Sequence, residues 1–167
     1  MAATDEAARF TDWARPSLLP MTRLARRLAP HADPEDIVQD ALVRAWRKWD
    51  QFDPARGTAS TWLLAITADR ARDARRSRVR RLRAVDDAAE LPDAAAPTGD
   101  AVGDLDLDRA IRALAQRQRL AVELHYFLGL SVEETAAVMG CATGTVKSTL
   151  HDARARLRHI LGDHDEH

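Results

Sequence analysis

Residues 131–158 read SVEETAAVMGCATGTVKSTLHDARARLR, and this stretch decides the fold of the C-terminal part. Ser131, followed by Glu134 three residues later, forms a capping box, which predicts the start of a short helix. Gly140 predicts the end of that helix, and a longer helix opens at Thr143. A short helix, a glycine-containing turn and a long helix are the helix-turn-helix pattern.

The long helix of this pattern has two different sides. Its apolar side, which is expected to pack inward, carries Val146, Leu150, Ala153, Leu157 and Ile160. The other side has small and hydrogen-bonding residues first and cations after them, namely Gly144, Lys147, Ser148, His151, Arg154, Ala155 and Arg158. This order is expected if the first turns meet base edges in a major groove while arginines contact phosphates. The alternative is a solvated face of a three-helix bundle, since cations near a helix C-terminus are favourable in any case.

Upstream of this pattern, the sequence predicts one further helix from about Leu107 to Leu128, ended by Gly129. The C-terminal part is therefore expected to contain three helices. The apolar positions of the first one are Ile111, Leu114, Ala121, Val122, Leu124 and Phe127.

The N-terminal part contains an equally clear helix start at Asp33, which can cap a helix whose first turn holds Pro34. The helix is expected to run to about Trp49. Its apolar stripe, predicted to face a core, consists of Ile37, Val38, Ala41, Leu42, Ala45, Trp46 and Trp49. The opposite face is polar and mixed in charge, with Asp36, Gln39, Asp40, Arg44, Arg47 and Lys48. Residues 9–29 are expected to add one or two helices to the same core.

A loop follows at residues 52–60, FDPARGTAS, with Thr58 or Ser60 available to cap a helix that begins near Thr61. Phe52 and Trp62 flank this loop. Their rings could stack on unpaired bases, although rings at such positions are more often plain core.

The helix after this loop carries a dense run of cations. Eight arginines lie between Arg70 and Arg83, opposed only by Asp73. Such crowding costs stability unless a polyanion or the acidic linker offsets it, and a phosphate polymer, an acidic partner or an anionic membrane would each accept the run.

The formal net charge of the 167-residue chain is −1, which alone argues against a nucleic-acid partner. That average hides a partition: the segment charges are +6 for residues 1–85, −8 for residues 86–108 and +1 for residues 109–167. The stretch 84–108, rich in Ala, Asp, Pro and Gly, predicts a flexible acidic linker.

Several classes of function have little support. A single cysteine, Cys141, excludes an internal disulfide framework and a multi-cysteine zinc site. We find no phosphate-binding glycine loop, metalloprotease motif or nucleophile elbow, so we expect no catalytic residues, no metal and no cofactor. Neither a secretion signal nor a membrane-crossing run is present, which predicts a cytoplasmic protein without membrane insertion.

These motifs, taken together over roughly residues 10–160, resemble a sigma-70-type initiation factor of the extracytoplasmic-function (ECF) group. Residues 33–46, DPEDIVQDALVRAW, are similar to the sigma-2 segment that binds the clamp helices of the polymerase β′ subunit. Residues 52–71, FDPARGTASTWLLAITADRA, are similar to the loop and helix that hold the melted non-template strand and read the −10 element. Residues 114–161 are similar to sigma-4, above all at Leu130–Ala136 and Gly144–Ser148.

The resemblance implies a role for particular residues. Core-polymerase contacts are expected at Asp36, Gln39, Asp40 and Arg44. Contacts to the −10 element are expected at Phe52, Arg56, Trp62, Asp69, Arg72, Arg75 and Arg76. Contacts to the −35 element are expected at Gly144, Thr145, Lys147, Ser148, His151, Arg154 and Arg158.

Departures from the family pattern concern charge. Asp69 stands where the family often has Asn, and a carboxylate near DNA is unfavourable unless Arg72 or Arg70 pairs with it. Thr149 and Asp152 stand where the family frequently has arginine, so affinity for the −35 element is expected to be low or unusually dependent on polymerase.

We therefore predict an all-α protein with two small helical domains joined by a flexible acidic linker. The expected boundaries are 1–83 for the sigma-2-like domain, 84–108 for the linker, 109–162 for the sigma-4-like helix-turn-helix domain and 163–167 for a tail. The expected function is transcription initiation without catalysis of its own. Its expected partners are core RNA polymerase (β′ clamp helices and β flap), promoter DNA and an anti-sigma factor. The alternative is a self-sufficient helix-turn-helix transcriptional regulator.

Overall fold

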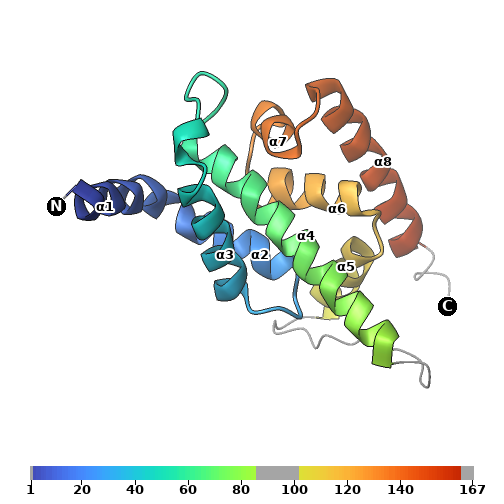
Figure 1. Ribbon diagram of the computed structural model, residues 1–167. Coiled ribbons are helices and arrows are strands. Elements are labelled where there is room, and N and C mark those ends of the chain that lie inside the picture. Colours follow the sequence, from blue (N-terminus) through green and yellow to red (C-terminus); the bar gives the residue numbers. More distant parts are fainter. Residues whose placement is uncertain (1, 86–101, 163–167) are drawn as a thin grey trace. The chain divides into compact units, whose positions relative to one another are not determined.

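The computed structural model describes residues 2–85 and 102–162, and the side chains of residues 5–82 and 106–162. Every regular element in these ranges is helical, which confirms the predicted fold class. The chain divides into two compact units, residues 1–93 and 94–167 (Figure 1). The middle of the predicted linker, residues 86–101, and the predicted tail lie outside the described residues.

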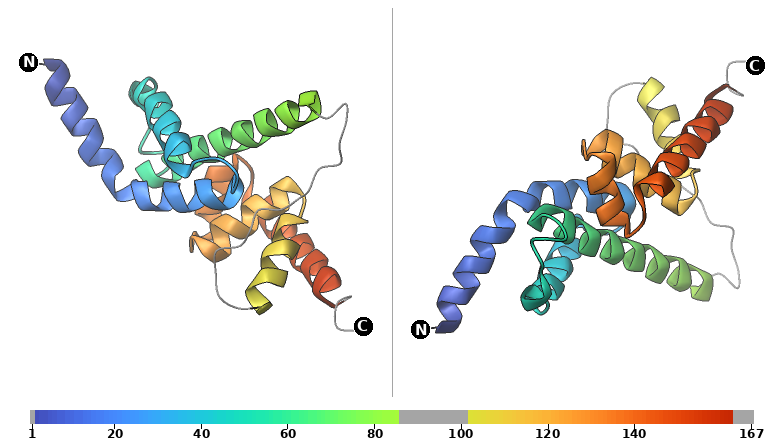
Figure 2. Two further views of the ribbon diagram at one scale, coloured as in Figure 1. Left: turned by 90° about the horizontal axis from the view of Figure 1, so that it is seen from below. Right: turned by 90° about the horizontal axis from the view of Figure 1, so that it is seen from above.

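The N-terminal unit is built from α1 (Ala2–Ala14), the 3₁₀ turn η1 (Arg15–Ser17), α2 (Leu18–Leu28), α3 (Pro34–Trp46), the 3₁₀ turn η2 (Trp49–Gln51) and α4 (Ala59–Val85). Helices α2, α3 and α4 pack on one another, and α4 extends past the other two (Figure 2). The side chains that fill the space between them are fully buried, for example Met21, Leu24, Ala41, Leu63 and Leu64.

Six aromatic residues gather at one end of this unit. Phe10 and Trp13 from α1 meet Trp46, Trp49, Phe52 and Trp62, with ring centroids 5.0–5.9 Å apart for the contacting pairs. We call these six residues the aromatic cluster. It attaches α1 to the three-helix core, because Phe10 packs edge-on against both Trp46 and Trp49.

Two helix boundaries in this unit differ from the predicted ones. Helix α3 ends at Trp46 rather than near Trp49, because the chain tightens into η2, and Trp49 then packs against Phe10 and Trp13. Trp46, expected in the core, lies at its margin and is 38% exposed. Helix α4 starts at Ala59, two residues early, because Thr58 is the residue that caps it.

The C-terminal unit contains α5 (Val102–Arg112), α6 (Gln116–Val122), the π-helical turn η3 (Glu123–Phe127), α7 (Val132–Met139) and α8 (Thr143–Gly162). Its core is aliphatic, and the buried members are Leu114, Ala121, Val122, Ala136, Val146, Leu150 and Ala153. Helix α5 covers residues 102–108, which the composition assigns to the linker.

The single helix predicted over residues 107–128 is wrong. The chain leaves the helical path after Arg112, and α6 starts again at Gln116 with the Gln118 side chain accepting a hydrogen bond from the Ala115 backbone N–H (3.2 Å). The last turn is π-helical, with the Leu128 N–H donating to the Glu123 carbonyl (3.0 Å). Phe127, expected in the core, is consequently 41% exposed.

Candidate protein and nucleic-acid interfaces

The outward face of α3 is polar from its first turn. Asp33 begins the helix by accepting a hydrogen bond from the Glu35 N–H (2.8 Å), as predicted. The four residues predicted to bind core polymerase are all exposed, while the other side of the helix is buried at Ile37, Val38, Ala41 and Ala45. Among the described residues, Asp36 and Asp40 form no ion pair, so both carboxylates are available to a basic surface, although Arg44 is exposed one turn after Asp40.

The loop before α4 is ordered by local hydrogen bonds. The Asp53 carboxylate accepts from the Ala55 N–H (2.9 Å), and the Asp53 carbonyl accepts from the Arg56 N–H (3.0 Å). Arg56 is exposed at the tip of this turn. Gly57 lies where a Cβ would stand only 2.9 Å from the Thr61 hydroxyl oxygen, so any larger residue would disturb the start of α4.

Phe52 and Trp62, predicted to flank the −10 loop, belong to the aromatic cluster. Their ring centroids lie 5.6 Å apart, and each ring also contacts Trp13, at 5.0 Å and 5.9 Å. Both side chains are half-buried. They therefore form part of the core and still keep some surface open beside the loop.

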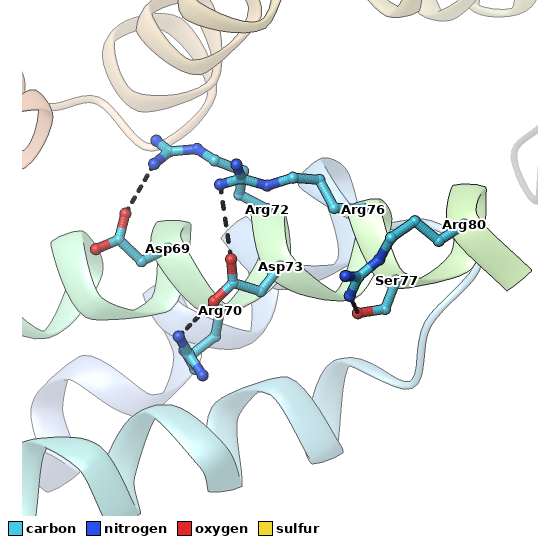
Figure 3. Close-up of polar contacts among 7 residues, drawn as sticks. All are labelled: Asp69, Arg70, Arg72, Asp73, Arg76, Ser77 and Arg80. Carbon is cyan, nitrogen blue, oxygen red and sulfur yellow. Dashed lines mark hydrogen bonds and ion pairs between the residues drawn. The ribbon is translucent and has the colours of Figure 1, made fainter.

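Three arginines of α4, Arg70, Arg72 and Arg76, pair with carboxylates of the same helix, as Figure 3 shows. Arg72 pairs with Asp69 at 2.9 Å, so one of the two compensating pairs considered for this carboxylate is present. Asp73 lies between two cations: Arg70 donates to it, and Arg76 lies 3.6 Å away. In these i,i+3 pairs, the two carboxylates offset part of the charge of three arginines and lower the repulsion between them.

Beyond Asp73, the exposed surface of α4 is almost purely cationic. The side chains of Arg75, Arg76, Arg78, Arg80 and Arg81 are exposed. Within the described part of the chain, Arg80 donates to the Ser77 hydroxyl (3.4 Å), a neutral partner (Figure 3). This half of α4 is therefore the strongest candidate in the N-terminal unit for contacting a polyanion.

The helix-turn-helix geometry is set by its local caps. The Ser131 hydroxyl accepts from the Glu134 N–H (3.0 Å), while the Glu134 carboxylate accepts from the Ser131 N–H (2.8 Å). This is the predicted capping box. Gly140 has a left-handed backbone (φ +62°) that turns the chain from α7 toward α8, and the half-buried Cys141 then packs on the aliphatic core.

Helix α8 presents the predicted face to solvent. Val146, Leu150 and Ala153 are buried, as expected from their spacing. All seven residues predicted to contact the −35 element are exposed, and these are Gly144, Thr145, Lys147, Ser148, His151, Arg154 and Arg158. Asp152 and Arg156, which were not included in that set, are exposed beside them.

The described residues show neither a metal site nor a membrane-spanning helix. Among the described residues, no cluster of three or more His, Cys, Asp or Glu side chains is placed to hold a metal ion. None of the described helices combines the length and the apolar character needed to cross a membrane.

Comparison with known proteins places both units in one family. Residues 17–81 match the family description "Sigma-70 region 2", and residues 104–157 match "Sigma-70, region 4". The chain is 37% identical to the RNA polymerase sigma-E factor of Streptomyces avermitilis over 98% of this chain and 90% of that protein. It is 33% identical to the ECF RNA polymerase sigma factor SigL of Mycobacterium tuberculosis over 83% of this chain and 81% of that one.

Two solved structures have a similar fold. One is the sigma factor RpoE in complex with the anti-sigma factor NepR from Bartonella quintana, with a TM-score of 0.73 and 31% identity over 92% of this chain and 97% of that one. The other is CnrH in complex with the cytosolic domain of CnrY, with a TM-score of 0.67 and 25% identity over 97% of this chain and 95% of that one.

Proposed function

Since the chain belongs to the ECF group of the sigma-70 factors, we propose that it binds core RNA polymerase and directs it to promoters. Sigma factors are regulatory proteins, and we assign no catalytic step to this chain: bond formation belongs to the polymerase. Its place of action is the cytoplasm, where polymerase and promoter DNA meet. The observation that carries the proposal is the order of surfaces along one chain, with a polar α3 face, an arginine-rich α4 and an exposed recognition helix α8.

We assign one role to each of these surfaces. The α3 face, led by Asp36 and Asp40, docks on the β′ clamp helices, since two unpaired carboxylates on a rigid helix suit a basic protein surface. The loop at Arg56, with the half-buried Phe52 and Trp62, captures an unstacked base of the −10 element, while the arginines of α4 hold the backbone.

The C-terminal unit reads the −35 element through α8 and meets the β flap. The domains are assigned as 1–83 and 109–162, with the acidic segment 84–108 as the tether and 163–167 as the tail. Two weak DNA readers on one tether gain affinity through effective concentration once polymerase fixes their separation. An anti-sigma factor, as in the complexes of NepR and CnrY, is proposed as the regulator.

The test is run-off transcription with bacterial core polymerase, the full chain and a library of promoters. We expect transcripts that require the protein and a preferred promoter class. Charge reversal at both Asp36→Lys and Asp40→Lys should lower co-purification with β′ at least tenfold, while Asp50→Lys, an exposed carboxylate on η2, serves as the matched control.

Two results would count against the proposal. Transcription that is the same without the protein would overturn the sigma function. Tight, sequence-specific binding of the protein alone to duplex DNA, with no effect of core polymerase, would favour the self-sufficient regulator instead.

A further inference from the structure

The exposed surface of α8 has two flanks with different chemistry. At about 100° per residue, Lys147, His151 and Arg154 share one flank with further cations. Roughly a third of a turn away, the second flank carries Ser148 and Asp152, four residues apart and both exposed. A helix in a groove would turn these flanks toward different base positions.

At Ser148 and Asp152 the second flank offers acceptors, and the donors of the same stripe, Arg156 and His159, lie one and two turns farther along α8. The Ser148 hydroxyl donates its proton to the Thr145 carbonyl (3.0 Å), and the Thr149 hydroxyl donates to the same carbonyl (2.7 Å). A hydroxyl has one proton, so while Ser148 donates to the Thr145 carbonyl it offers only lone pairs to a base. An ionised Asp152 also only accepts, and it forms no ion pair with any residue in the described part of the chain.

The bases differ in how well their major-groove edges hydrogen-bond with two neighbouring acceptors. Cytosine presents the N4 amine and adenine the N6 amine, whereas guanine presents O6 and N7, which are both acceptors. Adenine N7 lies beside its amine and repels a carboxylate, so cytosine fits best. We infer that the Ser148–Asp152 flank selects an amine-bearing base, cytosine first, and rejects guanine. This inference rests on the proposed function, because it requires α8 to lie in the major groove.

A carboxylate on a helix that lies against DNA weakens binding to every sequence, but by a different amount for each base that it faces. Phosphates repel Asp152 on any sequence, and exposed Lys147, Arg154, Arg156 and Arg158 supply the compensating charge on α8. Opposite guanine, the carboxylate would lose water and face O6 without a proton between them. Opposite cytosine, it gains a charge-assisted hydrogen bond. Rejection of the wrong base therefore adds to recognition of the right one.

The experiment uses holoenzyme assembled from core polymerase and the full chain, with a promoter library randomised over the −35 element. With the natural chain, one position should favour cytosine over guanine by about fivefold. Asp152→Asn should move that preference to adenine, because an amide pairs with both N6 and N7. Ser148→Ala should weaken selection at a neighbouring position by about threefold. Glu133→Gln removes one exposed charge from α7 of the same unit and should leave every preference unchanged.

The outcomes separate this inference from the proposed function. If the natural chain initiates transcription but Asp152→Asn and Ser148→Ala both leave all base preferences unchanged, the acceptor flank does not read DNA and the inference is overturned. If the natural chain initiates at no promoter, the proposed function fails, and the inference fails with it. Far-UV circular dichroism of both variants checks that α8 remains helical.

Discussion

Both units have an aliphatic core, but only the N-terminal unit adds a cluster of aromatic rings, and the difference bears on how each unit holds its candidate surface. The N-terminal unit places six aromatic rings at one end, including all four tryptophans of the chain. The C-terminal unit has an aliphatic core in which Ala121 and Ala153 are fully buried. In the N-terminal unit, large rings attach α1 and the loop after Phe52 to the core of α2, α3 and α4. In the C-terminal unit, small residues let the helices approach closely, and caps and turns set where α8 lies.

The same contrast applies to charge. In α4, Asp69 and Asp73 pair with arginines of their own helix, so part of the cationic surface is compensated before any partner arrives. In α8, Asp152 has no such pair among the described residues, and its neighbours point outward. The first unit therefore compensates part of its positive charge within α4, whereas the carboxylate on α8 stays unpaired among the described residues.

The largest expected effect concerns stability, and the test is whether the cores of the two units unfold independently. Leu150→Ala should lower the free energy of unfolding of the C-terminal unit by about 3 kcal/mol, because Leu150 is 4% exposed in the aliphatic core. Urea titration followed by circular dichroism should show this loss. Tryptophan fluorescence should not move, since every tryptophan lies in the other unit.

Leu24→Ala is the matched control, because Leu24 is buried on α2 in the N-terminal unit. It should move the fluorescence transition by a similar amount. If Leu150→Ala shifted both signals together, the two cores would unfold as one, and the division into independent units would be wrong.

A second test removes the centre of the aromatic cluster. Trp13→Ala should destabilise the N-terminal unit by about 2 kcal/mol, because Trp13 contacts four other rings while staying half-buried. Faster tryptic cleavage after Arg56 should accompany the loss, as Phe52 and the loop lose their anchor. Tyr126→Ala, at a 51% exposed aromatic residue of the C-terminal unit, should cost well under 1 kcal/mol. Equal losses for the two variants would show that the cluster contributes no special stability.

The smallest expected effect concerns the internal ion pairs of α4. Asp73→Asn should lower the free energy of unfolding by only about 0.5 kcal/mol, because exposed pairs contribute little. Binding of a labelled single-stranded oligonucleotide at low salt should become about threefold tighter, since Arg70 and Arg76 lose their compensating charge. Asp50→Asn, away from α4, should leave oligonucleotide affinity nearly unchanged. Weaker binding by the Asp73 variant would mean that Asp73 positions these arginines rather than compensating them.

Features that depend on neighbours in the sequence could be predicted. The caps at Asp33 and Ser131 and the turn at Gly140 involve residues within four positions of one another, and the structure has all three. The inward face of α8 followed from its period. The Asp69–Arg72 pair, three residues apart, was one of the two compensating pairs considered.

Features that depend on distant packing could not. Trp46 and Trp49 fit one helical stripe, but Phe10 and Trp13, from a helix far upstream, determine where those rings lie. No proline or glycine follows Arg112 to indicate that the helix is interrupted there. For the candidate site, sequence reasoning placed the exposed residues of α3 and α8 but left out Asp152, because charge alone counted it as unfavourable. The role that we propose for it depends on the hydrogen bond from Ser148 to the Thr145 carbonyl, which the sequence alone does not give.

The π-helical turn at Glu123–Phe127 also changes which later residues share a face with α6. A turn closed by an i→i+5 hydrogen bond contains more residues than an α-helical turn, so each residue advances by a smaller angle. Leu124 is fully buried, yet Phe127, three positions later, points to solvent. A mutational scan that assigns faces by α-helical spacing from α6 onward therefore assigns the wrong face after this turn, and the spacing restarts at the Ser131 cap.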